Sequence, residues 1–355
     1  MRTGRVRQHV GRFFLILITL VVVLMINVVV MIYMFCNGPS TAARDLFVTT
    51  MLETGQLKFV VSWFLDEKQI QEAIANNSLV ELDAELDTNL ITVENAAGEP
   101  AVMEEQEQQA VSIEEISGRT FFAKMMMIKD PSKVKVGTTY PWGAYGKELG
   151  EIVEQYDALA GVNGGLYQSA GNTGGYPCGI VVSEGEIQYN SCAGVNGLFL
   201  VGFNEDNILL IKDLRGMNNA QVEQLVQEER VRDAVVFQEE NSDANNHFVP
   251  LLINGEARLA DGLGSGANPR TAIGQRADGT VLLLVTDGRG TSGHLGATAT
   301  DLIQIMQEYG AVNAANIDGG SSSSMYYDGN YEMTSVTFYY ANSSWKLPTA
   351  FLVAK

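Results

Sequence analysis

The distribution of apolar residues divides the chain into unequal parts. Residues 13–35 form one uninterrupted apolar run without a charged side chain. At about 1.5 Å per residue, a helix over this run spans roughly 34 Å, enough to cross the hydrocarbon core of a bilayer. The run is longer than the apolar region of a cleaved signal peptide, and no small-residue cleavage site follows it. The pattern predicts an uncleaved transmembrane helix over residues 13–36.

Two polar-rich regions follow. Within residues 37–78, apolar positions recur at helical spacing and Asp66 is placed to cap a second short helix, which predicts a juxtamembrane helical segment without visible chemistry. Residues 79–118 contain eleven acidic side chains and neither Lys nor Arg. Such a segment repels itself and lacks apolar mass, so we expect an extended acidic stalk. A solvated helix face is the alternative for its C-terminal part.

From residue 119 to residue 355, short apolar runs alternate with glycine-rich turns. This texture predicts an α+β domain, a mixed and hairpin-rich β-sheet with a few helices. The expected strands are 121–128, 179–183, 186–189, 197–203, 207–211, 234–237, 250–253, 256–259, 271–275, 281–286, 314–317, 334–340 and 350–353. The expected helices are 145–157, 219–229 and 298–309, the last with a capping box at Thr298 and Asp301 and a stop at Gly310.

Charge narrows the range of functions. Lys plus Arg is 23 and Asp plus Glu is 42, for a net charge of −19. Tracking a nucleic-acid backbone requires clustered cations, so we expect no nucleic-acid partner. Four arginines precede the apolar run, which predicts a cytoplasmic basic tail over residues 1–12 and an extracytoplasmic remainder. The chain is thus expected to be a single-pass membrane protein, and its juxtamembrane helices leave homo-oligomerisation open.

Cysteine and histidine are scarce. Cys178 and Cys192 lie symmetrically about Gly185 in a predicted hairpin, which places them opposite each other and leaves either a disulfide or two separate thiols. The three histidines show no metal-site spacing. We therefore expect no cofactor and no protein-held metal, with a divalent ion at a bound phosphate left open.

Four segments carry more polar and glycine residues than packing requires. They are Asn163-Gly164-Gly165, Asn268-Pro269-Arg270-Thr271, Thr286-Asp287-Gly288-Arg289 and Asn316-Ile317-Asp318-Gly319-Gly320-Ser321. Glycine turns after strands let backbone N–H groups approach an oxyanion, guanidinium groups bind phosphate oxygens, and carboxyl groups move protons. Each segment also has a plainer interpretation: an Asp-Gly turn at 287, an ion pair from Arg270 to Asp287 or Asp318, and a flexible serine loop after Asp318.

Together, and in this order, the four segments resemble the signature of the phosphodiester glycosidase family, over roughly residues 121–353. The family includes N-acetylglucosamine-1-phosphodiester α-N-acetylglucosaminidase, and its bacterial members are often labelled exopolysaccharide biosynthesis proteins. The resemblance implies hydrolysis of a sugar-1-phosphodiester. Ser321 departs from the pattern, because many relatives have a third glycine there.

The resemblance implies a site lined by five polar residues of these segments and by the glycine turn after the last of them. These are Asn163, Arg270, Asp287, Arg289, Asp318 and the backbone of residues 319–321, and the accompanying motif residues Gly164, Gly165 and Thr271 are expected to bind substrate with them. From their chemistry, we expect Arg270 and Arg289 to clamp the phosphodiester. One of Asp287 and Asp318 would handle the water or the leaving oxygen, and the other would stabilise charge at the anomeric carbon. The amides of Gly319, Gly320 and Ser321 would hold a phosphate or sugar oxygen.

These expectations define a membrane-anchored bacterial hydrolase of the cell envelope. Its partner would be a phosphate-linked glycan or an envelope polymer. Two other functions remain open. One is a non-catalytic module that binds or assembles wall or exopolysaccharide polymers. The other is a serine hydrolase using Ser292 or Ser323 with His294, although no nucleophile-elbow spacing surrounds these serines.

Overall fold

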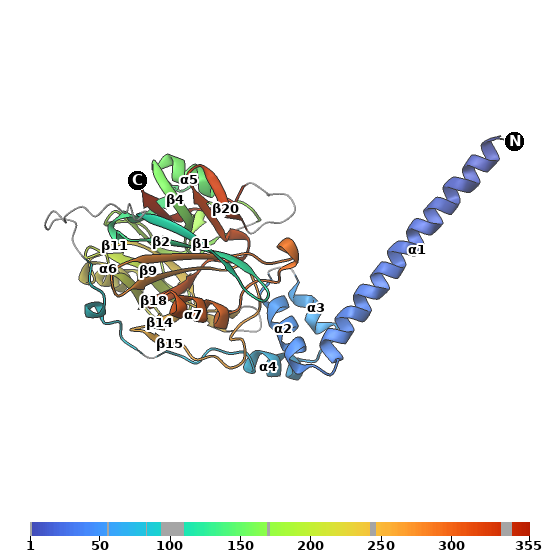
Figure 1. The fold of residues 1–355 in the computed structure, drawn as a ribbon, viewed down its shortest axis with the longest axis horizontal. Helices are drawn as coiled ribbons and strands as arrows, with labels where there is room; N and C mark the ends of the chain where they lie inside the picture. Colours follow the sequence, from blue (N-terminus) through green and yellow to red (C-terminus); the bar gives the residue numbers. More distant parts are fainter. Residues whose placement is uncertain are drawn as a thin grey trace.

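A computed structural model of the chain describes residues 2–54, 57–82, 84–93, 110–168, 171–241, 246–334 and 343–355. Its first element is the helix α1 (Arg2–Asn37), which projects from the rest of the molecule (Figure 1). The part from His9 to Asn37 is long and apolar enough to cross a membrane, and its most apolar stretch is not buried by the rest of the chain. The helix predicted over residues 13–36 is therefore confirmed as a helix of spanning length.

Three short helices follow α1: α2 (Thr41–Leu52), α3 (Lys58–Ser62) and α4 (Glu67–Ala75). The predicted cap is confirmed, because the Asp66 side chain accepts a hydrogen bond from the Gln69 backbone N–H and the Gln69 side-chain oxygen accepts one from the Asp66 backbone N–H. The Phe35 ring at the end of α1 stacks on Phe47 of α2, with ring centroids 5.7 Å apart. These contacts join the helical segment to the end of α1.

The acidic segment differs from the predicted stalk. The described parts of its first half lie along the domain: Val80 N donates to Leu259 O (2.8 Å), and Thr92 N donates to Ala277 O (2.8 Å). Further along, β1 (Val111–Ser117) pairs with β2 (Phe122–Ile128) at the edge of a sheet. Residues 94–109 of the segment lie outside the described residues. The boundary predicted at 119 is wrong for β1, because the charged side chains of an edge strand can face solvent.

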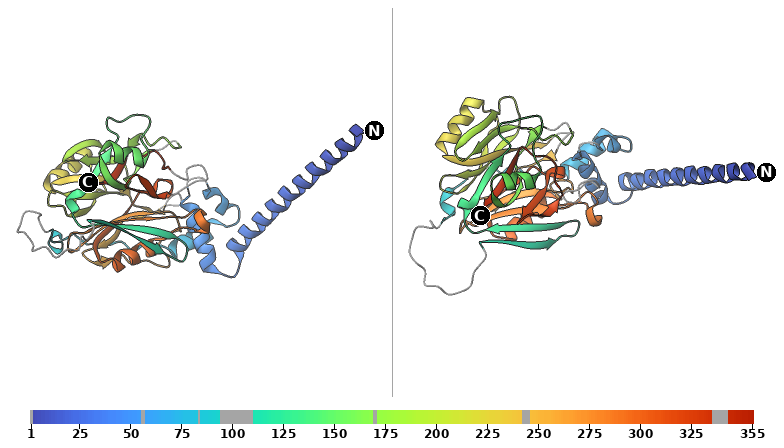
Figure 2. Two further views of the ribbon diagram at one scale, coloured as in Figure 1. Left: turned by 45° about the horizontal axis from the view of Figure 1, so that its top comes forward. Right: turned by 90° about the horizontal axis from the view of Figure 1, so that it is seen from above.

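Three antiparallel sheets form the domain, and Figure 2 shows them from two further sides. The largest sheet has the order β1-β2-β17-β16-β18-β14-β15, where the further strands are β17 (Val281–Thr286), β16 (Thr271–Arg276), β18 (Ala311–Ile317), β14 (Pro250–Ile253) and β15 (Glu256–Ala257). The second is β10 (Leu209–Asp213), β9 (Leu198–Asn204), β11 (Val231–Gln238), β7 (Gly179–Ser183) and β8 (Glu186–Ser191). The third is β20 (Asn330–Thr334), β19 (Ser324–Tyr327), β4 (Ala158–Asn163), β21 (Thr349–Ala354) and β3 (Val134–Thr138).

The minor elements are short. Two-stranded pairs join β5 (Tyr167–Gln168) with β6 (Tyr176–Pro177), and β12 (Glu240–Asn241) with β13 (Asn246–His247). The 3-10 turns are η1 (Thr88–Leu90), η2 (Pro131–Lys133), η3 (Thr291–Gly293) and η4 (Gly320–Ser322).

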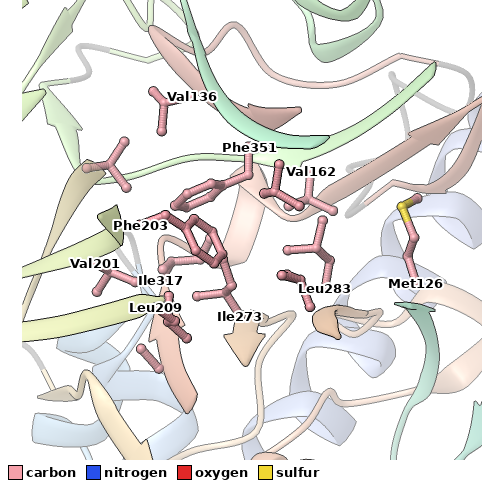
Figure 3. Packing of buried hydrophobic residues seen from close by; sticks show 14 of the residues in the cluster. Met126, Val136, Val162, Val201, Phe203, Leu209, Ile273, Leu283, Ile317 and Phe351 are labelled. Carbon is pink, nitrogen blue, oxygen red and sulfur yellow. The ribbon is translucent and has the colours of Figure 1, made fainter. Parts of the chain in front are cut away.

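The inner faces of all three sheets enclose one apolar core, part of which Figure 3 shows. Val201, Ile273 and Phe351 come from different sheets and belong to this core. Side chains alternate across a strand, so every second residue points outward. Val201 therefore faces the shared core, whereas its neighbour Leu200 packs on the outside of its own sheet.

One helix covers the outer face of each sheet. The helices are α7 (Ala299–Glu308) on the seven-stranded sheet, α6 (Asn219–Glu228) on the second and α5 (Leu149–Gln155) on the third. Central strands such as β9 and β17 are therefore buried on both faces and consist of nearly continuous apolar residues. This arrangement confirms the predicted α+β class.

Most predicted strands are present with shifts of a few residues at their ends, and the ranges 179–183, 250–253 and 281–286 are matched. All three domain helices form, although α5 begins four residues later than predicted. The strand predicted at 334–340 falls, apart from Thr334, outside the described residues. The list of expected strands omitted β1, β3, β4, β19 and β20, together with the two-residue strands β5, β6, β12 and β13.

The two hairpin cysteines are separate thiols, so the structure does not contain the disulfide that symmetry allowed. The hairpin itself is confirmed, with Gly179 opposite Ser191. Gly179 has φ +65°, which turns the chain just before the strand, and Cys178 N donates to Leu166 O instead (2.9 Å). Cys192 packs into the apolar cluster under α6. Burial and the nearby charge of Asp318 raise the pKa of Cys178, so this thiol lies on the side of Asp318.

Candidate active site

Three predicted site residues lie at one end of three neighbouring strands in the seven-stranded sheet, a region called the sheet edge below. Thr271 at the start of β16 pairs with Val285 of β17 on one side and with Ile317 of β18 on the other. Arg270 immediately precedes β16, whereas Asp287 immediately follows β17 and Asp318 immediately follows β18. All three residues therefore lie at the same end of these antiparallel strands. Neighbouring strands are about 4.8 Å apart, so the ends of β17 and β18 are separated by about 10 Å with β16 between them.

Asn163, at the end of β4, connects the third sheet to this edge. Its Nδ2 donates to the Asp318 carbonyl oxygen (2.6 Å), and its Oδ1 accepts from Thr271 Oγ1 (2.7 Å) and Ser324 N (3.2 Å). Asn163 and Thr271 have no exposed surface. The prediction that these two side chains bind substrate is therefore corrected: both are occupied inside the protein, and they hold the backbone of Asp318.

Gly164 and Gly165, which follow Asn163, are packed closely against neighbouring backbone and side chains. Gly164 N donates to Thr349 O (3.0 Å), and a Cβ on Gly164 would lie 2.4 Å from Thr349 Oγ1. A Cβ on Gly165 would lie 2.5 Å from Val236 O. Both glycines are buried, so they allow close packing of the chain after β4 against its neighbours.

Asp318 is partly exposed, whereas the other carboxyl, Asp287, is buried. Burial raises the pKa of Asp318 to about 7, although hydrogen bonds from the Ser322 side chain and the Gly319 backbone, together with the charge of Arg289, act in the opposite direction. Ser322 Oγ also lies 3.0 Å from the Tyr167 hydroxyl. A carboxyl with this pKa exists in both protonation states near neutrality, as proton transfer at physiological pH requires.

Asp287 is buried and both its oxygens are engaged. Oδ1 accepts from Phe122 N (2.8 Å), and Oδ2 lies 2.6 Å from His294 Nδ1. The carboxylate thereby holds the proton of the imidazole on Nδ1, which leaves Nε2 as an acceptor. The His294 side chain is 32% exposed, so the histidine that pairs with buried Asp287 is accessible to solvent.

Arg289 lies in a tight turn between these two carboxyls. Arg289 and Ser292 are non-glycine residues with φ of 54° and 51°, a conformation that surrounding structure must enforce. The Arg289 Nη1 donates to Ser321 Oγ (2.9 Å). Its guanidinium covers Gly320, where a Cβ would lie 2.7 Å from Nη2. The residue as a whole is exposed, whereas the groups around its guanidinium desolvate it and lower its pKa.

The turn after Asp318 offers fewer free amides than expected. Gly320 N donates to Pro269 O (2.8 Å), and Gly319 N hydrogen-bonds the Asp318 carboxyl. The predicted oxyanion contact from all three amides is therefore corrected for these two. Among the described groups of this turn, the Ser321 amide is the one for which the structure gives no acceptor. Gly319, Gly320 and Ser321 remain partly exposed beside Arg289.

Arg270 forms a buried ion pair, and its partner is neither Asp287 nor Asp318. Its Nη2 donates to Glu53, the C-terminal capping residue of α2, as well as to Gly266 O (2.9 Å). The guanidinium also lies over the Phe248 ring, 4.9 Å from its centroid. Arg270 is 6% exposed. The expected clamp of two arginines thus consists, in this structure, of one exposed arginine and one buried arginine beside it.

Four features of the site were not predicted from the sequence. They are the side chains of Glu53, Tyr167 and Ser322, and the pairing of His294 with Asp287. His294 follows Asp287 by seven residues across a Gly-rich turn, which is a usable local signal. Glu53 has no such signal, because it is 217 residues from Arg270. Within the described residues there is no group of three His, Cys, Asp or Glu side chains that could hold a metal ion.

Comparison with known proteins agrees with this architecture. A family model described as phosphodiester glycosidase matches residues 156–354. The catalytic domain of zebrafish N-acetylglucosamine-1-phosphodiester alpha-N-acetylglucosaminidase, auto-inhibited by its pro-peptide, superimposes with a TM-score of 0.51 at 19% identity. That match covers 72% of this chain and 87% of the zebrafish chain, and at this identity it shows a shared fold.

Two further matches are more limited in coverage or in structural similarity. A putative exported protein from Burkholderia pseudomallei superimposes with a TM-score of 0.44 at 16% identity, over 66% of this chain and 74% of the other. The SPbeta prophage-derived uncharacterized protein YomE of Bacillus subtilis (strain 168) is 42% identical over 64 residues, or 18% of this chain. This chain spans only 10% of the length of that curated relative.

Proposed function

The chain belongs to the phosphodiester glycosidase family, and from this premise we propose that it hydrolyses a sugar-1-phosphodiester, releasing the sugar and leaving a phosphate monoester on the carrier. The proposal rests chiefly on one juxtaposition: the guanidinium of Arg289, an exposed residue, is bonded to Ser321 and lies beside the carboxyl of Asp318, whose pKa is raised to about 7. A cation for the phosphate and a proton donor for its bridging oxygen are what this reaction needs.

Arg289 would bind the two non-bridging oxygens of the phosphodiester, because a guanidinium matches their geometry. The Ser321 hydroxyl and amide lie next to it and would supply further donors. In a chain with a net charge of −19, such a local cation is required to hold an anionic substrate. Arg270 would contribute its charge from behind, because its own donors are bound within the protein.

Asp318 in its protonated form would donate a proton to the oxygen between the sugar and phosphorus as the sugar–oxygen bond breaks. His294, oriented by Asp287, would accept a proton from the attacking water at Nε2. The sugar then carries the water oxygen, and the carrier keeps its phosphate. The separation of about 10 Å between the ends of β17 and β18 leaves space for a sugar between the two groups.

The length and composition of α1 support an anchored enzyme that acts outside the cytoplasm, with the four N-terminal arginines inside. The substrate would then be a phosphate-linked glycan of the cell envelope or an exopolysaccharide. A phosphodiester of N-acetylglucosamine is the first compound to test, because it is the substrate named for the zebrafish enzyme of the same fold.

The test uses the full chain in detergent, incubated with the methyl-phosphate diester of N-acetylglucosamine and with UDP-N-acetylglucosamine, with and without EDTA. Free sugar is measured by mass spectrometry in water enriched in ¹⁸O. A glycosidase places ¹⁸O in the sugar, whereas a phosphodiesterase places it in the phosphate. The Asp318→Asn variant should lose release, and Asp328→Asn, at an exposed turn, is the matched control.

Saturable glycan binding without release of any sugar would instead favour the non-catalytic binding module. The serine-hydrolase alternative receives less support, since within the described residues no hydrogen bond joins His294 to Ser292 or Ser323. Labelling by a serine-directed phosphonate would revive it.

A further inference from the structure

The loop that precedes β16 is bound to the helix α2 at several points. The Glu53 side chain, which is 3% exposed, accepts from Gly266 N at Oε1 (2.7 Å). Its Oε2 accepts from Asn268 Nδ2 (3.0 Å) and pairs with Arg270 Nη2. One carboxylate from the juxtamembrane segment therefore joins three residues of the loop that carries the site.

The fit between α2 and this loop is close along its length. Ala267 N donates to Thr50 Oγ1 (3.0 Å), and a Cβ on Gly266 would lie 2.5 Å from Thr50 N. Near α4, Leu263 N donates to Asn77 Oδ1 (3.1 Å). A backbone that approaches this closely is seated on its neighbour, so the juxtamembrane helices belong to the same packed unit as the sheet edge.

Asn268 carries this attachment toward the exposed part of the site. Its Nδ2 is bound by Glu53, and its Oδ1 accepts a long hydrogen bond from Arg289 Nε (3.5 Å). Arg289 in turn donates to Ser321 Oγ. A continuous set of side-chain contacts thus leads from α2 through Asn268 to the guanidinium of Arg289.

The charges support the same assignment. The nearby charge of Arg270, after burial, lowers the pKa of Arg289, whereas the carboxyls of Asp318 and Glu53 raise it. Without Glu53, the buried Arg270 would be left without a carboxylate partner. An unpaired buried charge is costly, and Arg270 would repel Arg289 or draw Asp318 toward itself. Either shift removes a group from the position that the phosphate requires.

On the premise of the proposed function, we propose that Glu53 is a positioning residue of the site: it neutralises Arg270 and fixes Asn268, so that Arg289 is the guanidinium presented to phosphate. The competence of the site then depends on the segment next to the membrane helix. Simple charge counting predicts the opposite sign, because removal of a carboxylate beside two arginines should strengthen anion binding.

The test measures binding of inorganic phosphate to the full chain in detergent by titration calorimetry, together with KM and kcat for the diester. Glu53→Gln keeps the shape and removes the charge, Glu53→Asp keeps the charge on a shorter side chain, and Glu67→Gln is an exposed control on α4. We expect Glu53→Gln to weaken phosphate binding and raise KM roughly ten- to a hundredfold, since small misplacements have effects of that size. Glu53→Asp should be intermediate, and Glu67→Gln unchanged.

Folding is checked by circular dichroism for every variant. If Glu53→Gln does not fold, Asn268→Ala takes its place, because it leaves the Glu53–Arg270 pair intact and interrupts the path to Arg289; the same loss of phosphate affinity is expected. Phosphate binding that is unchanged or tighter in a folded variant overturns the inference, and tighter binding would show that Glu53 blocks the site. Absence of phosphate binding by the parent chain also overturns it.

The outcome is separable from that of the proposed function. A parent chain that binds phosphate and loses this affinity in Glu53→Gln, but releases no sugar from any diester, supports the role of Glu53 and contradicts the proposed reaction. A chain that hydrolyses the diester with an unchanged KM in Glu53→Gln supports the reaction and contradicts the role of Glu53.

Discussion

Replacement of Asp318 by Asn should stabilise the protein at alkaline pH while removing its proton donor. The ordinary pKa of an Asp carboxyl is about 3.9, and burial raises the pKa of Asp318 to about 7 in the folded chain. Between these values the folded chain retains a proton that the unfolded chain releases. The free energy of unfolding therefore falls as pH rises through this window, and the loss is complete above about pH 7.

The size of the effect follows from the two pKa values. At 1.36 kcal/mol for each tenfold change in proton affinity, the full loss is at most about 4 kcal/mol. About 1.5 kcal/mol of it already applies at pH 5, so at most about 2.5 kcal/mol separates pH 5 from pH 8. Asp318 is partly exposed, and solvent screening reduces this limit. We expect Asp318→Asn to gain about 1–2 kcal/mol over the parent between these two pH values.

Thermal unfolding of the full chain in detergent, followed by tryptophan fluorescence at pH 5 and pH 8, measures this gain. For a domain of this size, 1–2 kcal/mol corresponds to a relative shift in Tm of roughly 3–6 °C. Other titrating groups cancel in the comparison between parent and variant, and Asp328→Asn controls for loss of a surface charge. A variant whose Tm follows that of the parent at both pH values would refute the buried, titrating carboxyl.

The remaining predictions concern the groups around Asp318. The kcat of the parent should fall as pH rises through about 7, because the proton donor is lost, and a rate profile over pH 5–9 tests this. Arg289→Ala should raise KM about a hundredfold with a smaller change in kcat, measured on the diester. Asp287→Asn should lower kcat about a hundredfold or more, because His294 loses the carboxylate that orients it; an unchanged kcat would exclude the pair from the reaction. Asn163→Ala should lower the free energy of unfolding by about 2–4 kcal/mol in urea, because it leaves buried partners unsatisfied.

The sheets could be predicted from the sequence because their strands have strong local signals. The run of residues from Val281 to Val285 is continuously apolar, and the Glu184-Gly185 and Asn254-Gly255 turns take positive φ at both positions, as expected for tight hairpins. The strand β1 has a weak signal, because its charged residues face outward at a sheet edge and only every few positions are apolar. The sequence therefore predicted a stalk where the structure has a strand.

The site was predictable in position and less so in the role of each residue. Motifs at strand ends identified Asp287, Arg289 and Asp318, because local sequence determines which residue follows a buried strand. Whether a polar side chain faces solvent or is consumed inside depends on contacts across the fold. Asn163 is enclosed by β16 and β19, and Arg270 meets a carboxylate from α2. No local pattern specifies either partner.

The distribution of charge explains how so acidic a chain can present a site for an anion. Glu53 offsets the charge of Arg270 inside the protein, so Arg289 is the cation that reaches the surface. Beside it, Asp318 is largely neutral below pH 7, because burial disfavours its carboxylate. The protonated form thus removes a negative charge from the place where phosphate would bind and holds the proton that its bridging oxygen would take. Above pH 7 both advantages disappear together, which links anion binding and proton donation to one carboxyl.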